Sequence, residues 1–132
     1  MNRNLRTRLL WVAATDSTFE RMEQGGRAVL SGRCIHCRRR HVLSPDGEPL
    51  SPASLEHIMP RNHGGTNEAA NLAIACKSCN AAKGRRLDCR RKGDPDLERV
   101  VEQLTARRAD RWREPPEGWL LGDPPPEWND PS

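Results

Sequence analysis

The chain of 132 residues has little with which to build a large apolar core. It contains no tyrosine and one phenylalanine, hydrophobic residues make up 35% of the sequence, and the mean hydropathy is -0.85. Burial of apolar surface has to offset the conformational entropy lost on folding, and a short chain buries a small fraction of its surface. The composition therefore predicts one small domain that needs a further source of stability.

The sequence also lacks a long apolar run. No stretch approaches the roughly 20 apolar residues that a membrane-spanning helix requires. The N-terminal stretch Met1–Thr15 scatters arginines among apolar positions and does not separate a charged region from an apolar one, as a secretory signal does. We therefore expect a cytoplasmic protein with no membrane partner.

The charge is unevenly distributed along the chain. The formal net charge is +4, but all 22 basic and 13 of the 18 acidic residues precede residue 114, which gives residues 1–113 a net charge of +9. A basic body is typical of a nucleic-acid binder, because neutralising phosphates releases condensed counterions. A solvated basic surface is the alternative.

Local patterns predict three helices separated by loops and short strands. Apolar residues repeat at helical spacing over residues 4–14, and a Ser-x-x-Glu capping box opens residues 17–26, which a Gly-Gly pair closes. An Asp-Pro pair opens an apolar stripe that ends near residue 108. Between these helices, turn formers alternate with short apolar runs that predict strands. The runs cover residues 41–43, 54–58 and 72–75.

The C-terminal tail has a composition of its own. Residues 114–132 hold six of the 11 prolines, two of the four tryptophans, five acidic residues and no basic residue. Proline excludes a regular helix and favours an extended, polyproline-like segment. Because disordered segments are usually poor in aromatic residues, this tail is either disordered or docked on the domain or on a protein partner.

Five cysteines fall in a pattern typical of a zinc site. They form the pairs Cys34-x2-Cys37 and Cys76-x2-Cys79, and Cys89 stands alone as an expected free thiol. Each pair places two thiolates in one tight turn, and two pairs complete the tetrahedral four-sulfur shell that Zn²⁺ prefers. Two disulfides are the alternative, but a cytoplasmic chain is kept reduced. We expect structural Zn²⁺ to supply the folding free energy that the core lacks.

Basic residues crowd the two cysteine pairs. Four thiolates and one Zn²⁺ sum to a charge of −2, so part of this basicity balances the zinc site and part is available for nucleic acid. His36 lies inside the first pair and is an alternative zinc ligand.

Between the cysteine pairs lies a compact series of polar residues. An acid-His pair, a Gly-Gly pair, an Asn-Leu pair, a CxxC-Asn run and a Lys-Gly pair follow one another in LEHIMPRNHGGTNEAANLAIACKSCNAAKG, residues Leu55–Gly84. This string resembles the HNH endonuclease motif, and the flanking cysteine pairs match the zinc-stapled branch of that family. The resemblance spans Cys34–Gly84 and leaves both ends of the chain outside it. It implies an α+β fold with a ββα-metal core, in which a hairpin and a helix hold one divalent ion.

The acid-His pair also suits phosphodiester hydrolysis on chemical grounds. This reaction needs a base for the attacking water and a cation for the charge that grows on the phosphate. His57 can be the base, because an imidazole with an ordinary pKa of about 6.5 is largely neutral at cellular pH. Glu56 provides a hard anionic oxygen beside it. Adjacent side chains of a strand point to opposite faces, so we expect the strand to end at this pair.

The resemblance implies a role for each residue of the motif. His57 would activate water, Asn71 would fix the loop that carries His57, and Glu56 and Asn80 would hold the catalytic ion. Two protein oxygens leave most of the coordination sphere to water and phosphate, which suits Mg²⁺ or Mn²⁺. The family commonly has Asp or His at the position of Glu56 and often His at that of Asn80, so other divalent ions remain candidates.

Basic residues near the motif are predicted to contact the phosphate backbone of DNA. They are Arg61, His63, Lys83, Arg85 and Arg86. No aromatic residue is interleaved with the basic run, which argues against a single-strand stacking groove, and the resemblance implies duplex DNA. For His63 a solvated loop position is the alternative.

We therefore predict a metal-dependent HNH endonuclease with four segments. They are an N-terminal helical segment (1–30), a nuclease core with zinc knuckles (31–93), a C-terminal helix (94–113) and an acidic tail (114–132). The alternative is a zinc-knuckle module of the same fold that binds nucleic acid without cutting it.

Overall fold

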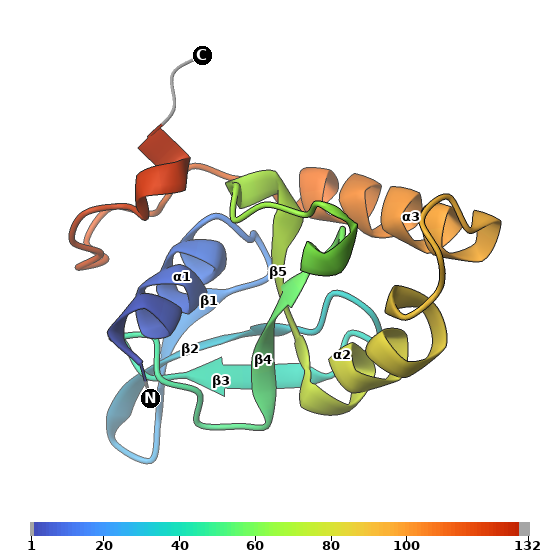
Figure 1. The fold of residues 1–132 in the computed structure, drawn as a ribbon. Helices are drawn as coiled ribbons and strands as arrows, with labels where there is room; N and C mark the ends of the chain where they lie inside the picture. Colours follow the sequence, from blue (N-terminus) through green and yellow to red (C-terminus); the bar gives the residue numbers. More distant parts are fainter. Residues whose placement is uncertain (1, 130–132) are drawn as a thin grey trace.

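The structure, a computed structural model, describes residues 2–129 and has an α+β fold (Figure 1). The described residues contain three α-helices and two small antiparallel sheets, with strand orders β1-β2-β3 and β4-β5. The elements are α1 (Arg3–Ala14), β1 (Glu20–Gln24), β2 (Arg27–Arg33), β3 (Arg40–Leu43), β4 (Ala53–His57), β5 (Leu72–Cys76), α2 (Lys77–Lys83) and α3 (Pro95–Arg111). None of the described helices is both long and apolar enough to cross a bilayer.

Residues 20–31 form a hairpin, so the predicted helix over residues 17–26 is wrong. β1 and β2 pair antiparallel, and the turn between them consists of Gly25 at φ +59° and Gly26 at φ +79°. Two consecutive residues with positive φ are what a type I′ hairpin turn requires. The capping box does not form, and Ser17 N, which the Glu20 side chain would accept from in such a box, donates 2.7 Å to the carbonyl of Arg111 instead.

The β4–β5 hairpin lies at the centre of the molecule, with apolar residues packed on both of its faces. Leu72 and Ile74 belong to a buried cluster with residues of α1, whereas Ala73 and Ala75 belong to a second cluster with Leu104 of α3. Successive strand residues point to opposite faces, and β5 is therefore buried along its whole length. The apolar runs predicted at residues 54–58 and 72–75 thus form the paired central strands.

Helix α3 begins as predicted and extends to Arg111, somewhat beyond the predicted end. Asp94 caps its N-terminus by accepting hydrogen bonds from the backbone N–H groups of Asp96 and Leu97. Near the other end Arg108 is 1% exposed, and its guanidinium donates 2.9 Å hydrogen bonds to the backbone oxygen and the hydroxyl of Thr15. Burial lowers the pKa of Arg108 to about 10, which leaves it protonated at neutral pH.

Neighbouring arginines extend this attachment to the backbone. Arg113 donates to the carbonyls of residues 13 and 14 at the C-terminal end of α1, where helix carbonyls lack partners. Arg107 donates to the carbonyl of residue 35, and Arg111 donates to the carbonyls of residues 33 and 34. Part of the basic charge of the body is therefore structural and cannot neutralise phosphates.

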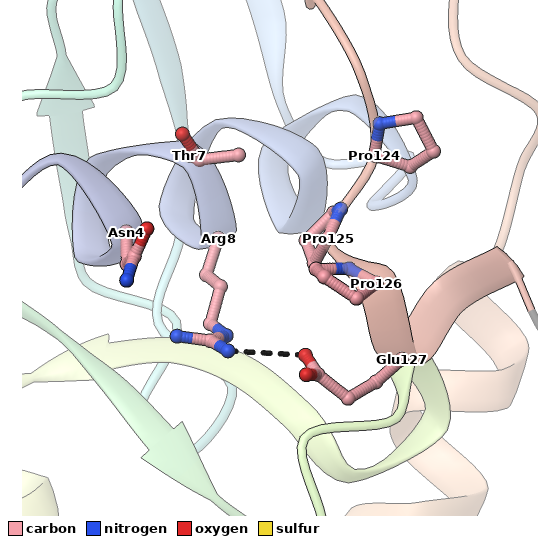
Figure 2. Close-up of a pocket in the computed structure, with 7 residues that line it drawn as sticks. All are labelled: Asn4, Thr7, Arg8, Pro124, Pro125, Pro126 and Glu127. Atoms are coloured by element: carbon pink, nitrogen blue, oxygen red, sulfur yellow. Dashed lines mark hydrogen bonds and ion pairs between the residues drawn. The ribbon is translucent and has the colours of Figure 1, made fainter.

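The tail is docked on α1, which decides the alternative that the sequence left open. Trp128 packs edge-on against Trp11, with ring centroids 6.0 Å apart. Arg8 and Glu127 form a 3.0 Å ion pair, and Pro124–Pro126 line a groove with the same helix (Figure 2). The segment predicted to be extended also includes residues 130–132, which lie outside the described residues.

We predict that Arg108→Met lowers the free energy of unfolding by about 2–4 kcal/mol, because it removes two hydrogen bonds to the buried oxygens of Thr15. Denaturant unfolding monitored by circular dichroism measures this change. The matched control is Arg99→Met on the exposed face of α3, for which we expect less than about 0.5 kcal/mol. Equal effects of the two substitutions would contradict a structural role for Arg108.

Candidate functional site

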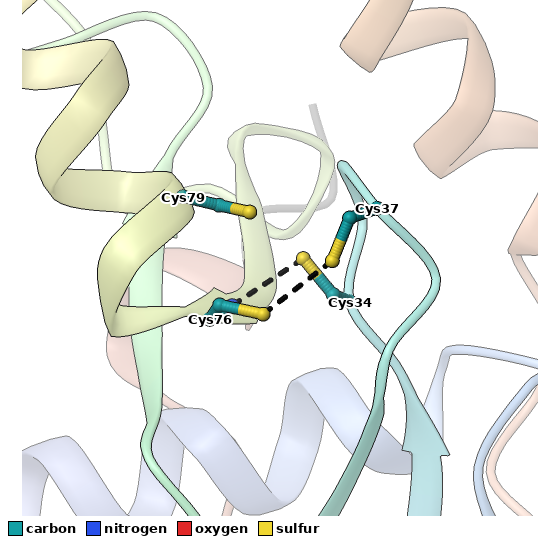
Figure 3. Close-up of side chains that lie close together, drawn as sticks. All are labelled: Cys34, Cys37, Cys76 and Cys79. Atoms are coloured by element: carbon teal, nitrogen blue, oxygen red, sulfur yellow. Dashed lines mark hydrogen bonds between the residues drawn. The ribbon is translucent and has the colours of Figure 1, made fainter.

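The two cysteine pairs converge on one point (Figure 3). Cys34 and Cys37 lie in the loop after β2, and Cys76 and Cys79 lie where β5 passes into α2. The four sulfur atoms are all within 4.8 Å of one another, and those of Cys37 and Cys76 are 3.5 Å apart. A tetrahedral Zn²⁺ with Zn–S bonds of about 2.3 Å spaces its sulfurs about 3.8 Å apart, whereas a disulfide needs about 2.05 Å. The cluster therefore fits a structural zinc site and not a disulfide.

Backbone N–H groups point at the sulfur atoms of this zinc site. Cys34 Sγ accepts 3.3 Å hydrogen bonds from the backbone nitrogens of His36 and Cys76. The backbone N–H of Arg39 lowers the pKa of the Cys37 thiol to about 7, whereas burial raises that of Cys76 to about 11. Binding of Zn²⁺ must therefore displace protons from the more buried thiols, so zinc affinity falls as the pH falls.

His41 supports the zinc site from outside the cluster, a role that its spacing did not reveal. It is 2% exposed, and its Nδ1 lies 2.8 Å from the hydroxyl of Ser51, which also accepts a hydrogen bond from Val42 N. A thiolate at Cys76 only accepts hydrogen bonds, so Nε2 would donate to Cys76 Sγ across 3.0 Å and Nδ1 would accept from the Ser51 hydroxyl. Burial lowers the pKa of His41, which keeps the ring neutral.

We predict that Cys76→Ser abolishes stoichiometric zinc binding and unfolds the domain, because structural zinc contributes on the order of 10 kcal/mol to folding. Zinc content and the thermal unfolding transition measure the effect. The control is Cys89→Ser, since Cys89 is exposed and lies outside the four-sulfur cluster. A Cys76→Ser protein with the same zinc content and unfolding transition as the control would contradict the proposed structural zinc site.

A second site lies between β4, the loop that follows it and α2. His57 and Asn80 line a cavity of about 240 Å³ there, together with Arg61 and Asp88. Asn80 lies in α2, and its Nδ2 donates to the carbonyl of Leu55 in β4 at 3.2 Å. This hydrogen bond fixes the amide at the cleft. Hairpin and helix thus bring the predicted base and one predicted ion ligand to the same cavity.

The loop that follows His57 is held at both ends by Asn71. The Asn71 side chain accepts a 2.7 Å hydrogen bond from Met59 N and donates to the carbonyls of Met59 and Thr66 at 3.1 and 2.9 Å. The Gly-Gly pair permits this path, because Gly64 has φ +87° and a Cβ on Gly65 would lie 1.8 Å from the carbonyl oxygen of Met59. The loop geometry therefore requires both glycines.

Glu56 faces away from this cavity. β4 and β5 pair in regular register through both Glu56 and His57, so no bulge turns these two side chains to one face, although β4 does end at His57. Glu56 is fully buried, and its Oε1 is hydrogen-bonded to His36 Nε2. Its Oε2 has no hydrogen-bond partner among the described residues and lies 3.8 Å from Lys83 Nζ. The ring of His36 is therefore hydrogen-bonded to Glu56 and is not one of the clustered zinc ligands.

The family model described as HNH endonuclease matches residues 34–86. These residues form an HNH domain. No curated protein and no solved structure matches the chain. The HNH domain starts at the first clustered cysteine and contains the zinc site, the β4–β5 hairpin, α2 and the cavity residues His57 and Asn80. The N-terminal helix, the first hairpin, α3 and the tail lie outside the matched residues and surround the domain.

The basic residues predicted to contact DNA differ in accessibility within the HNH domain. Arg61, Arg85 and Arg86 are exposed. His63 is half-buried, and its Nε2 donates 3.0 Å to the carbonyl of Asp88. Lys83 is 4% exposed and donates 2.9 Å to the Asp88 carboxylate, so the prediction that it contacts phosphate is corrected. Lys83 also lies 3.8 Å from the Glu56 carboxylate of β4, so its charge is paired inside the domain. Its place in a basic run of the sequence did not indicate this.

Proposed function

We propose that the HNH domain is a metal-dependent endonuclease that hydrolyses phosphodiester bonds in DNA. The observation that carries this proposal is the cavity shared by His57 and Asn80, the predicted base and a predicted ion ligand, in a domain of a nuclease family. A module that only binds nucleic acid has no need for an imidazole beside an amide oxygen at an open cleft.

His57 is the base in the proposed reaction. Its side chain is half-buried, so the imidazole is held by the protein and still reaches the cavity. A neutral imidazole takes the proton of a water molecule as that water attacks phosphorus. Exposed Arg61 lines the same cavity and offers its guanidinium to the non-bridging oxygens of the phosphate.

The donor set around α2 fits a hard divalent cation. Glu56 Oε2 is a buried carboxylate oxygen that accepts no hydrogen bond from the described residues. Asn80 donates through Nδ2 to Ser54 Oγ, and Ser54 shares the face of Glu56 because the two residues are two positions apart in β4. We infer that Asn80 Oδ1 would hold Mg²⁺ or Mn²⁺. Glu56, which lies on the opposite face of β4 from His57 and 3.8 Å from Lys83 Nζ, would supply the second oxygen, as oxygen ligands suit these ions. When bound, the ion stabilises the charge that develops on the phosphate and the leaving 3′-oxygen.

The proposed substrate is duplex DNA bound through its backbone. Arg85 and Arg86 lie in the helical turn Gly84–Asp88 that follows α2 and are exposed, as is Arg61 at the cavity. These guanidinium groups suit phosphate contacts, which position the duplex without selecting a sequence. Because such contacts release counterions, the affinity for DNA should fall steeply as the salt concentration rises.

We predict that His57→Ala lowers the rate of nicking of supercoiled plasmid in Mg²⁺ or Mn²⁺ by about 100-fold or more, since the base is lost. Gel assays of nicked and linear products measure the rate, and added imidazole should restore part of it in the variant. Zinc content and the unfolding transition serve as controls and should stay unchanged. A His57→Ala protein that cuts at the wild-type rate would contradict this mechanism. A wild-type protein that binds DNA without cutting it would favour the binding module.

A second prediction concerns the ion ligands. Glu56→Gln and Asn80→Ala should each raise the Mn²⁺ concentration for half-maximal cutting by about tenfold or more, because each removes one of two protein ligands. The matched control is Glu48→Gln, an exposed carboxylate outside the HNH cavity. Unchanged Mn²⁺ dependence in both ligand variants would place the ion elsewhere.

A further inference from the structure

The ring of His57 is held in one orientation by Asn67. His57 Nε2 lies 2.7 Å from Asn67 Oδ1. An amide oxygen only accepts hydrogen bonds, so Nε2 is the donor, and in the neutral ring this tautomer leaves the lone pair on Nδ1. A base needs this state, because the unprotonated nitrogen is the one that can take a proton from water. Asn67 lies outside the acid-His, Asn-Leu and CxxC-Asn runs of the motif, and no spacing in the sequence marks it.

Asn67 is in turn held by the C-terminal tail. Trp128 Nε1 donates a 2.9 Å hydrogen bond to the backbone oxygen of Asn67, which lies 61 residues earlier in the chain. Asn71 fixes the loop on either side of the Gly-Gly pair, up to Thr66, but its side chain makes no contact with Asn67 in the described hydrogen bonds. The indole thus supplies the hydrogen bond that secures the loop at the residue touching His57.

The position of Trp128 is well determined by α1. Its ring packs at 72° on Trp11, and the preceding residue, Glu127, forms the ion pair with Arg8. Trp128 N also donates 2.9 Å to the carbonyl of Pro125, which closes the short turn at the end of the proline run. Figure 2 shows this run lying along the helix. An exposed acidic tail with no role in the domain would not need such a set of contacts.

We propose that Asn67 and Trp128 are positioning residues for His57, so that docking of the tail on α1 completes the catalytic site. This inference rests on the proposed role of His57 as a base. The chain of contacts runs from α1 to the Trp128 indole, from the indole N–H to the Asn67 carbonyl, and from the Asn67 side chain to His57 Nε2. The tail therefore acts on the reaction without touching the substrate.

The test compares variants that remove single hydrogen bonds. Asn67→Ala removes the acceptor of His57 Nε2, Asn67→Asp keeps it, and Trp128→Phe keeps the ring on Trp11 but removes the indole N–H. We expect Asn67→Ala and Trp128→Phe to lower kcat for plasmid nicking in Mn²⁺ by about tenfold to a hundredfold with KM unchanged, because orienting groups act on the chemical step. Asn67→Asp should retain at least half of the rate. The matched control is Trp119→Phe, a tail tryptophan that packs on the guanidinium of Arg113 and should cut at the wild-type rate.

A second measurement is independent of cutting. Nitrogen-15 NMR of the ring of His57 reports which nitrogen carries the proton and how fast that proton exchanges with water. We expect a protected Nε2–H in the full-length wild-type and Trp119→Phe proteins and faster exchange in Asn67→Ala and Trp128→Phe. Unchanged exchange in both of the latter variants, or unchanged kcat in a protein that cuts, overturns the positioning role. A wild-type protein that cuts no DNA but shows this pattern of exchange overturns the proposed function and leaves the positioning of His57 standing.

Discussion

The four-sulfur zinc site is the constraint on which the rest of the structure depends. It joins the loop after β2 to the start of α2, two segments that lie far apart in the chain. The apolar core cannot do this alone, because it is divided into two small clusters by the central hairpin, and one of them includes two of the zinc-site cysteines. Zinc bound there would fix the start of α2, the helix that carries Asn80 to the cavity of His57.

Hydrogen bonds from α3 and from the C-terminal tail also hold the HNH domain in place. Arginines near the end of α3 attach this helix to the end of α1 and to the first cysteine pair. The tail lies on another part of α1 and reaches the loop after β4 through Trp128. Segments outside the matched residues therefore hydrogen-bond to the cysteine loop of the HNH domain and to its loop after β4.

Much of this organisation could be predicted from local pattern, and the errors have physical causes. The cysteine spacing, the strands of the central hairpin and α3 follow from short-range rules. The helix expected over residues 17–26 failed because the turn chemistry of Gly25 and Gly26 prevailed over a capping box. The burial of Lys83 and Arg108, and the contacts of His41, Asn67 and Trp128, depend on partners far away in the chain. Glu56 and His57 follow the alternation of a strand, whereas Asn80 of α2 donates to Ser54, on the face of Glu56, and also lines the cavity of His57.

The most direct measurement is anomalous X-ray diffraction from crystals of the full chain with a DNA duplex and Mn²⁺, recorded at the zinc and manganese edges. We expect a zinc peak among the sulfur atoms of Cys34, Cys37, Cys76 and Cys79. We expect a manganese peak within about 2.5 Å of oxygens of Glu56 and Asn80, with His57 Nδ1 directed at the phosphate beside it. A manganese peak bound by other residues, or a phosphate out of reach of His57, would contradict the proposed arrangement of the site.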